Sequence, residues 1–154
     1  MAMINTDYEV CQDGFLVSTD PDLLQLDAIQ DFLSRAYWAQ GRPRHIIQRS
    51  IQNSLCFGVY QDAAQVGFAR LVTDYTTYAW LCDVFIHEDF RGRGLAKLLI
   101  HCVTEHPELQ NLRRWALATR DAHGLYEQFG FSQISDPQKY MQIFDPLPYA
   151  PSSE

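Results

Sequence analysis

Apolar residues in the first third of the chain recur at the spacing of an amphipathic helix. The members of this stripe are Ile29, Phe32, Leu33, Ala36 and Tyr37. Asp20-Pro21 supplies an N-cap followed by a proline suited to the first helical position, and Gly41 is expected to end the helix. Beyond Gly41 we predict a second helix from Pro43 to about Asn53, with Ile47 and Ile51 facing inward.

Four apolar segments have the length and residue types of strands. A short one spans Phe15 to Ser18, and three longer ones span Leu55 to Tyr60, Gln65 to Thr73 and Tyr78 to Ile86. Only a few polar residues separate the last three, and connections this short join antiparallel neighbours. The first part of the chain is therefore expected to form antiparallel sheet.

The second half of the chain alternates between helix and strand patterns. Its first helix has an apolar face formed by Leu95, Leu98, Leu99, Cys102 and Val103. We expect this helix to end before Pro107. The short apolar segment from Arg114 to Thr119 would then return parallel to the strand at 78–86, as in a β-α-β crossover. A helix from Ala122 to Phe129 and a strand from Phe131 toward Phe144 complete the expected core.

Together these elements predict a mixed α/β sheet, in which antiparallel strands are followed by one parallel crossover. The 154 residues suit a single domain, which we place at residues 8–145. The proline-rich tail at residues 146–154 cannot continue a strand and is expected to be extended or disordered.

A basic glycine turn follows the strand that ends at Ile86 and precedes the helix that begins near Leu95. Its residues are Arg91, Gly92, Arg93, Gly94, Leu95, Ala96 and Lys97. The turn brings free main-chain N–H groups, a helix N-terminus and several cations to one place, where a group with two phosphates fits. Its two glycines leave room for a close approach, and we expect Lys97 to point to solvent.

Two common phosphate-binding motifs do not match this turn. The dinucleotide fingerprint needs a third glycine where this chain has Lys97, and a P-loop needs a Gly-Lys-Ser/Thr sequence that the chain lacks. The pattern that remains is Arg91-x-x-Gly94-x-Ala96. It resembles the acetyl-CoA pyrophosphate loop of the GNAT superfamily of N-acetyltransferases.

A second motif lies at residues 121–131, about thirty residues downstream. It reads as a short helix followed by Gly130, which stands where a left-handed C-cap is needed. It is similar to the Leu-Tyr-Glu-x-x-Gly-Phe signature that closes the core of the same superfamily. The resemblance covers roughly residues 10 to 145. The chain departs from it at Thr119, where the family often has an asparagine that contacts CoA.

The resemblance implies a fold in which two neighbouring parallel strands splay apart and acetyl-CoA, the co-substrate, enters the gap. It implies an oxyanion site on the main-chain N–H groups of the stretch Val84, Phe85 and Ile86. It also implies that Tyr126 contacts the cofactor and acts as the general acid for the departing thiolate. A phenol with a pKa of about 10 can donate to a thiolate of similar basicity.

The residues that would complete the reaction are less clearly marked. Asp83 and Asp74 are candidate bases for the proton of the amine, His123 could relay it, and a chain of water molecules is the alternative. No cysteine has a convincing base partner, so we expect direct transfer in a ternary complex rather than an acetyl-enzyme.

Aromatic and acidic residues are expected to wall the acceptor pocket. These are Tyr37, Trp38, Asp74, Tyr78 and Trp80. Aromatic walls near Asp74 and Asp83 suit an amine with an apolar or cationic body. A small-molecule amine is favoured, and a protein lysine or N-terminus is the alternative acceptor.

Composition narrows the partners. The formal charge of −7 argues against nonspecific nucleic-acid binding, and no apolar run approaches the roughly eighteen residues of a membrane span. The N-terminus lacks the features of an export signal, so a cytoplasmic location is expected. The four cysteines are widely spaced, which predicts reduced thiols and no metal site.

Two further possibilities follow from the resemblance. Thr119 and the lack of an obvious base leave open a non-catalytic acyl-CoA-binding sensor module. Dimers are common in the superfamily, and the aromatic, proline-bearing C-terminus could pair across a homodimer.

Overall fold

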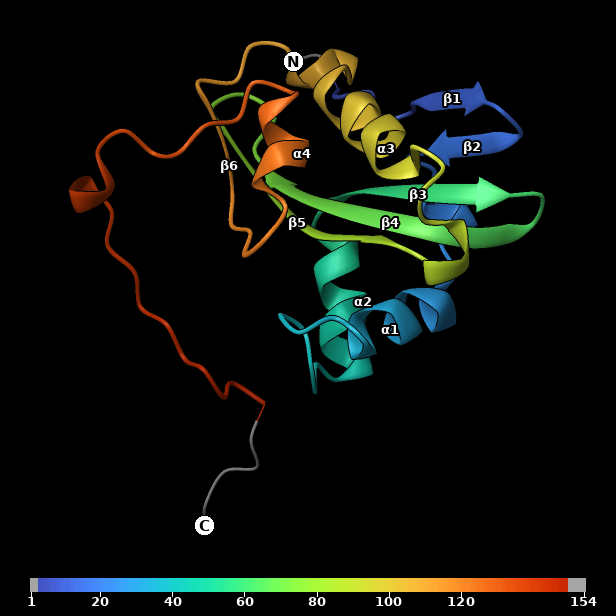
Figure 1. The fold of residues 1–154 in the computed structure, drawn as a ribbon, viewed down its shortest axis with the longest axis horizontal. Helices are drawn as coiled ribbons and strands as arrows, with labels where there is room; N and C mark the ends of the chain where they lie inside the picture. The colour runs from blue at the N-terminus through green and yellow to red at the C-terminus, as the bar shows by residue number, and fades with distance from the viewer. Residues whose placement is uncertain (1–2, 150–154) are drawn as a thin grey trace.

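Six strands form one sheet, and their order in the sheet is their order in the chain (Figure 1). The computed structural model describes residues 3–149. The strands are β1 (Glu9–Gln12), β2 (Phe15–Ser18), β3 (Leu55–Gln61), β4 (Ala64–Thr73), β5 (Tyr78–Ile86) and β6 (Arg114–Leu117). Neighbouring strands from β1 to β5 are antiparallel, whereas β6 runs parallel to β5. The predicted mixed sheet with one parallel crossover is confirmed.

Helices cover both faces of the sheet. They are α1 (Leu26–Ser34), α2 (Arg44–Gln52), α3 (Leu95–Thr104) and α4 (His123–Glu127). The first two lie on one face and the last two on the other (Figure 1). Phe32 of α1 stacks on Phe85 of β5 in one apolar cluster, and Leu99 of α3 belongs to the other. No helix among residues 3–149 has both the length and the apolar character needed to cross a membrane.

The hairpin of β1 and β2 begins the sheet, and its first strand was not predicted from the sequence. The side chains of β1 are mostly exposed, so the strand carries almost no hydrophobic pattern. The turn that joins the strands contains Asp13 and Gly14, both with positive φ (52° and 81°). Asp-Gly is a strong hairpin signal, so the turn chemistry could have identified β1.

The predicted first helix is wrong at both ends. Asp20 caps a separate 3₁₀ turn at Pro21–Leu23, where its side chain accepts a hydrogen bond of 2.9 Å from the N–H of Asp22. The helix then ends at Ser34. The apolar spacing in the sequence extends past the end of the helix because Ala36 is also buried, although it lies in the loop that follows α1. Tyr37 therefore lies in the α1–α2 loop rather than on a helix.

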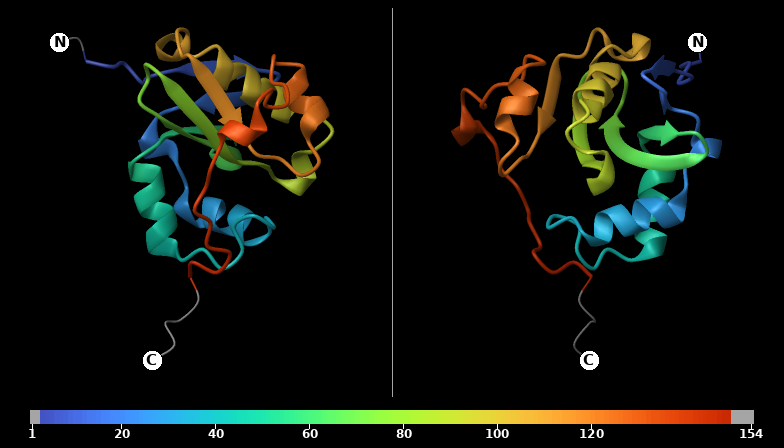
Figure 2. Two further views of the ribbon diagram at one scale, coloured as in Figure 1. Left: turned by 90° about the vertical axis from the view of Figure 1, so that its left-hand side faces the viewer. Right: turned by 45° about the vertical axis from the view of Figure 1, so that its right-hand side comes forward.

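The predicted strand from Phe131 to Phe144 is absent. A 3₁₀ turn at Pro137–Lys139 interrupts the segment, and the remainder up to residue 149 has no helix or strand. The segment runs outward past β6 and then back toward the α1–α2 loop (Figure 2). Proline cannot donate to a strand ladder, and no neighbouring strand pairs with these residues. The rest of the predicted tail, residues 150–154, lies outside the described part of the chain.

Candidate functional site

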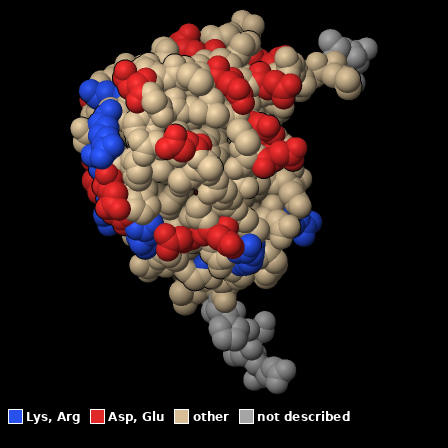
Figure 3. All heavy atoms as spheres, turned by 90° about the vertical axis from the view of Figure 1, so that its right-hand side faces the viewer, with Lys and Arg blue, Asp and Glu red and all other residues tan. Residues whose placement is uncertain are grey.

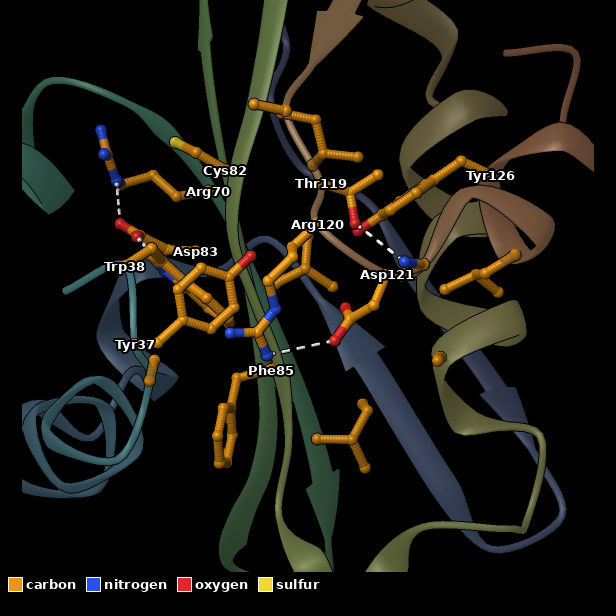
Figure 4. Close-up of a pocket in the computed structure, with 18 of the residues that line it drawn as sticks. Tyr37, Trp38, Arg70, Cys82, Asp83, Phe85, Thr119, Arg120, Asp121 and Tyr126 are labelled. Carbon is orange, nitrogen blue, oxygen red and sulfur yellow. Dashed lines mark hydrogen bonds and ion pairs between the residues drawn. The ribbon is translucent and has the colours of Figure 1, made fainter. Parts of the chain in front are cut away.

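A cavity opens where β5 and β6 part. The two strands pair over four residues and stop at Leu81 and Leu117, although β5 continues to Ile86. The cavity has a volume of about 690 Å³, and it is walled by the α1–α2 loop, β5, the loop after β6, and α4 (Figure 4). The splayed parallel strands implied by the family resemblance are therefore present, and the cavity lies where they separate.

A β-bulge shapes the wall of the cavity on β5. Phe68 of β4 pairs with Phe85, and Arg70 pairs with Cys82, so two residues of β5 oppose one residue of β4. Asp83 lies in the bulge with a φ of 52°, in the left-handed region. A bulge re-aims side chains at the point where a strand departs from regular pairing. Here it brings the Asp83 carboxylate into a cluster of cations.

The carboxylate of Asp83 is held by three donors. Its Oδ2 accepts hydrogen bonds of 2.8 Å from both Arg70 Nε and Arg42 Nη1, and its Oδ1 accepts one of 3.1 Å from Trp38 Nε1. Burial alone would raise the pKa of Asp83, but the charges of Arg70 and Arg42 outweigh it and lower the pKa. A carboxylate so stabilised is a poor proton acceptor, which argues against the base role suggested for Asp83.

The glycine turn presents main-chain donors beside the cavity. Gly92 and Gly94 both have a φ of 77°, and no atom of the structure would contact a Cβ at either position. Among residues 3–149, the N–H groups of residues 92–97 donate no hydrogen bond, and the first helical bond of α3 runs from Leu98 N to Gly94 O. Six consecutive free donors at a helix N-terminus form a site suited to an anion.

The cations of this turn take different positions. Arg91 Nε donates to the carbonyl of Ile86 at 3.0 Å, and its guanidinium lies 5.3 Å from the centre of the Phe85 ring. Arg91 thereby lines the main cavity together with Ala96. The side chain of Arg93 lies over the Phe90 ring instead. Lys97 lines a smaller adjoining cavity of about 220 Å³ beside the glycines and Leu95.

Tyr126 lies on α4 and lines the cavity from the side opposite Asp83 (Figure 4). It is 8% exposed, and Gly130 closes the helix behind it with a φ of 90°, as the sequence predicted. Burial, and to a smaller extent Tyr37, raise the pKa of Tyr126. The phenol therefore keeps its proton at neutral pH and is available to donate it.

Thr119 has a structural partner at the start of α4. Its hydroxyl accepts a hydrogen bond of 3.0 Å from the main-chain N–H of Ala122. Thr119 therefore organises the turn that leads into α4, and it also lines the cavity. This arrangement accounts for a short hydroxyl side chain at the position where an asparagine was expected.

The predicted acceptor residues separate into two groups. Tyr37, Trp38 and Trp80 line the cavity, whereas Asp74 and Tyr78 do not. Asp74 lies in the β4–β5 turn, where hydrogen bonds from the side chain and N–H of Thr77, and from neighbouring N–H groups, lower its pKa. Asp74 therefore stabilises a turn at the opposite end of β5 from the glycine turn.

Several cavity residues were not identified from the sequence. Arg42 and Arg70 reach Asp83 from distant positions, and Arg120 lies 3.9 Å from the centre of the Tyr37 ring. Arg120 thus connects the loop after β6 with the α1–α2 loop across the cavity (Figure 4). None of these arginines belongs to a local motif, so only the packed fold could place them.

Cys82 is the cysteine of the cavity wall. Burial raises the pKa of its thiol to about 11, although Arg70 opposes the shift. The protonated thiol is a weak nucleophile at neutral pH. Among residues 3–149, no group of three or more His, Cys, Asp or Glu side chains could hold a metal ion.

Comparisons with known proteins agree with this geometry. The family model of the acetyltransferase (GNAT) family matches residues 23–131. FG08082 of Gibberella zeae, which carries a provisional acetyltransferase name, is 32% identical over 133 residues, covering 73% of this chain and 75% of that protein. A Xanthomonas campestris pv. campestris crystal structure provisionally assigned to the same family is 47% identical with a TM-score of 0.86, covering 88% of this chain and 96% of that chain.

A more distant structure shares the fold alone. The glucosamine-6-phosphate N-acetyltransferase of Arabidopsis thaliana has a TM-score of 0.61 at 12% identity, covering 85% of this chain and 97% of that chain.

The Asp83 cluster yields a prediction about stability. Replacing Asp83→Asn keeps the side-chain shape and tolerates the positive φ, but it leaves Arg42 and Arg70 without a counter-charge. We expect the free energy of unfolding at pH 7 to fall by about 3 kcal/mol, as for other buried pairs that lose one partner. Urea unfolding measures this change.

The matched control is Asp27→Asn, which removes an exposed carboxylate paired with Arg44 and should change stability by less than about 1 kcal/mol. Because the folded-state pKa of Asp83 is lowered, its stabilisation is present above about pH 4 and is lost as the pH falls further. The difference in the free energy of unfolding between wild type and Asp83→Asn should therefore become smaller in acid. Equal losses in the two variants at pH 7 would contradict the assignment.

Proposed function

This chain belongs to the acetyltransferase (GNAT) family, and we propose that it transfers an acetyl group from acetyl-CoA to the primary amine of a small molecule. The observation that carries this proposal is the position of the six free N–H groups of residues 92–97. Ala96 of this turn lines the cavity that opens where β5 and β6 part, and Gly92, Gly94, Leu95 and Lys97 line the smaller cavity beside it. A diphosphate held there would direct the rest of the cofactor between the strands.

The turn offers several contributions to binding the pyrophosphate of acetyl-CoA. Main-chain N–H groups donate hydrogen bonds, and the α3 dipole favours negative charge at its N-terminus. Arg91 is placed to screen the phosphates from the cavity side, and Lys97 from the side of the smaller cavity. Residues Gly92 to Lys97 are therefore the proposed cofactor site.

The end of β5 supplies donors for the reacting carbonyl. Beyond Leu81 the strand has no partner on its β6 side, so the stretch Val84 to Ile86 borders the cavity with main chain as well as side chains. A main-chain N–H aimed at the developing oxyanion would stabilise the transition state by roughly 3 kcal/mol. This is the role that we propose for the stretch.

The reaction needs one proton transfer to the CoA thiolate and another away from the amine. Tyr126 donates its phenolic proton to the CoA thiolate as the carbon–sulfur bond breaks. The two carboxylates of the cavity, Asp83 and Asp121, are both paired with arginine, so we propose that the proton of the amine leaves to water. The raised pKa of Cys82 favours direct attack by the amine on the thioester over an acetyl-cysteine intermediate.

A second candidate function is a sensor that binds acyl-CoA without turnover. The observation in its favour is that Asp83, a candidate base, already accepts hydrogen bonds from Arg42, Arg70 and Trp38. Tight binding of acetyl-CoA without CoA release in the presence of a broad amine panel would favour the sensor. Acetylation of a protein lysine instead of a small amine would change the acceptor class and leave the transferase proposal intact.

Two further properties belong to this proposal. All four cysteines are free, which fits the reducing cytoplasm as the place of action.

The C-terminal segment also exposes apolar side chains, including Met141, Ile143 and Phe144. Exposed apolar surface often marks a contact with another protein. We propose that this segment contacts a second copy of the chain.

Replacing Tyr126→Phe tests the acid assignment. Loss of the phenolic proton should lower kcat about 100-fold, the lower end for a general acid, while the Kd for acetyl-CoA changes little. Steady-state kinetics and calorimetry measure the two quantities. Tyr75→Phe is the control, because Tyr75 is a half-buried phenol outside the cavity. If kcat is unaffected by Tyr126→Phe, Tyr126 is not the acid.

Replacing Gly94→Asp tests the cofactor site. The new carboxylate would face the phosphates, so we expect acetyl-CoA affinity to fall at least about tenfold below that of Gly94→Asn. Asparagine matches aspartate in shape and also tolerates a positive φ, which makes it the proper control. Equal calorimetric affinities for the two variants would refute a diphosphate at this turn.

Replacing Ile143→Lys tests the association of two copies. Ile143 is fully exposed in the single chain, so the change should not affect folding. We expect sedimentation analysis to give a dimer for the wild type and a weaker one for the variant. Met3→Lys, another exposed apolar position at the other end of the described chain, is the control. A monomeric wild type at micromolar concentration would exclude the dimer.

A further inference from the structure

The α1–α2 side of the cavity contains more positive than negative charge. Arg42 of the α1–α2 loop pairs with Asp83 of β5 at 2.8 Å. Arg70 of β4 points at the same carboxylate (Figure 4). Two guanidinium groups thus share one carboxylate, and the trio has a net charge of about +1. The side chains of the arginines are only 13% and 15% exposed, so water screens this charge poorly.

The arginines still have donors available. The guanidinium of Arg42 donates to no acceptor other than Asp83 among residues 3–149, and that of Arg70 donates otherwise only to the hydroxyl of Ser54, at 3.1 Å. A guanidinium has five N–H groups in a planar fork. Both arginines line the cavity, and we expect their unused N–H groups to be the donors that a molecule bound there contacts.

Asp83 has little capacity left for a cationic ligand, because three of the roughly four acceptor sites of its carboxylate are taken. Its Oδ2 accepts from both arginines and its Oδ1 from the Trp38 indole. The other carboxylate of the cavity, Asp121, is paired with Arg120. The expectation of an amine with a cationic body depended on Asp74 and Asp83, and neither offers a free carboxylate to the cavity.

The positive site contrasts with the rest of the molecule. The chain has a formal charge of −7, and acidic side chains dominate the middle of the face shown in Figure 3. Five arginines and two aspartates are the charged residues of the cavity wall. One of these arginines, Arg91, lies next to the proposed diphosphate site. Arg42 and Arg70 lie at Asp83 instead, so an anion other than the cofactor phosphates is needed to balance their remaining positive charge.

We propose that the acceptor is a primary amine that also carries an oxyanion, a carboxylate or a phosphate, and that Arg42 and Arg70 bind this oxyanion. The inference rests on the proposed acetyltransferase function and names the acceptor class for it. Arginine forks suit oxyanions because two N–H groups can bond two oxygens at once. The rings of Tyr37 and Trp38, with centres 5.2 Å apart, provide an apolar wall beside these donors.

Matched pairs of amines test the proposal. The pairs are L-phenylalanine with phenethylamine and phosphoethanolamine with ethanolamine, and a diamine serves as a cationic probe. In at least one pair, kcat/KM for the member that carries the oxyanion should exceed that of its partner without one by about tenfold or more, as expected for charge-assisted hydrogen bonds. The pair that shows the preference distinguishes carboxylate from phosphate.

Variants identify the source of the preference. In Arg42→Gln the ratio of kcat/KM within the preferred pair should fall toward one. Arg44→Gln is the matched control, since Arg44 is an exposed arginine on α2 that pairs with Asp27 outside the cavity. The control should keep the wild-type ratio. A preference for the diamine or the amines without an oxyanion, or an unchanged ratio in Arg42→Gln, would overturn the proposal.

A binding measurement separates this inference from the proposed function. Calorimetry of the same amines against protein saturated with CoA should show tighter binding of the member that carries the oxyanion and loss of that difference in Arg42→Gln. If no amine releases CoA but the affinity order holds, the transferase proposal fails and the anion site stands. If amines are acetylated without any preference or affinity difference, the anion site fails alone.

Discussion

Main-chain groups that find no partner among the residues that the structure describes are the constraint from which this site follows. After four paired residues, β5 and β6 separate, and the edge of β5 beyond Leu81 no longer has a strand beside it. The N–H groups of residues 92–97 likewise donate to no group of the described chain. Most of these residues are exposed, so their N–H groups are available to an anionic ligand in place of water. A ligand that accepts hydrogen bonds from both places would give these main-chain donors their partners.

The Asp83 bulge is the second determinant, because it directs a buried carboxylate toward the α1–α2 loop. Arg42 and Trp38 are thereby fixed to β5, and Arg70 is fixed from β4. The same contacts that hold the loop in place also set the charge of the cavity. The position of the loop and the proposed acceptor specificity therefore depend on the same three hydrogen bonds.

Local patterns in the sequence predicted what local physics determines. The strands of residues 55–86, the α3 helix and the glycine turn follow from apolar spacing and from glycine conformations, and all are present. β1 was missed because its exposed side chains carry no pattern, and the strand predicted after Phe131 failed because a strand needs a partner edge as well as suitable residues. Arg42 and Arg70 could not be predicted, since their role arises from pairing with Asp83 over 41 and 13 residues of sequence.

The central claim is that the free N–H groups of residues 92–97 hold the diphosphate of a CoA thioester that lies between β5 and β6. Amide NMR shifts on titration with CoA test it most directly, with adenosine as the ligand that lacks phosphates. The account predicts that CoA shifts the amides of residues 92–97 and of Val84 to Ile86, and that adenosine leaves the glycine turn unchanged. Shifts confined to other parts of the chain would contradict it.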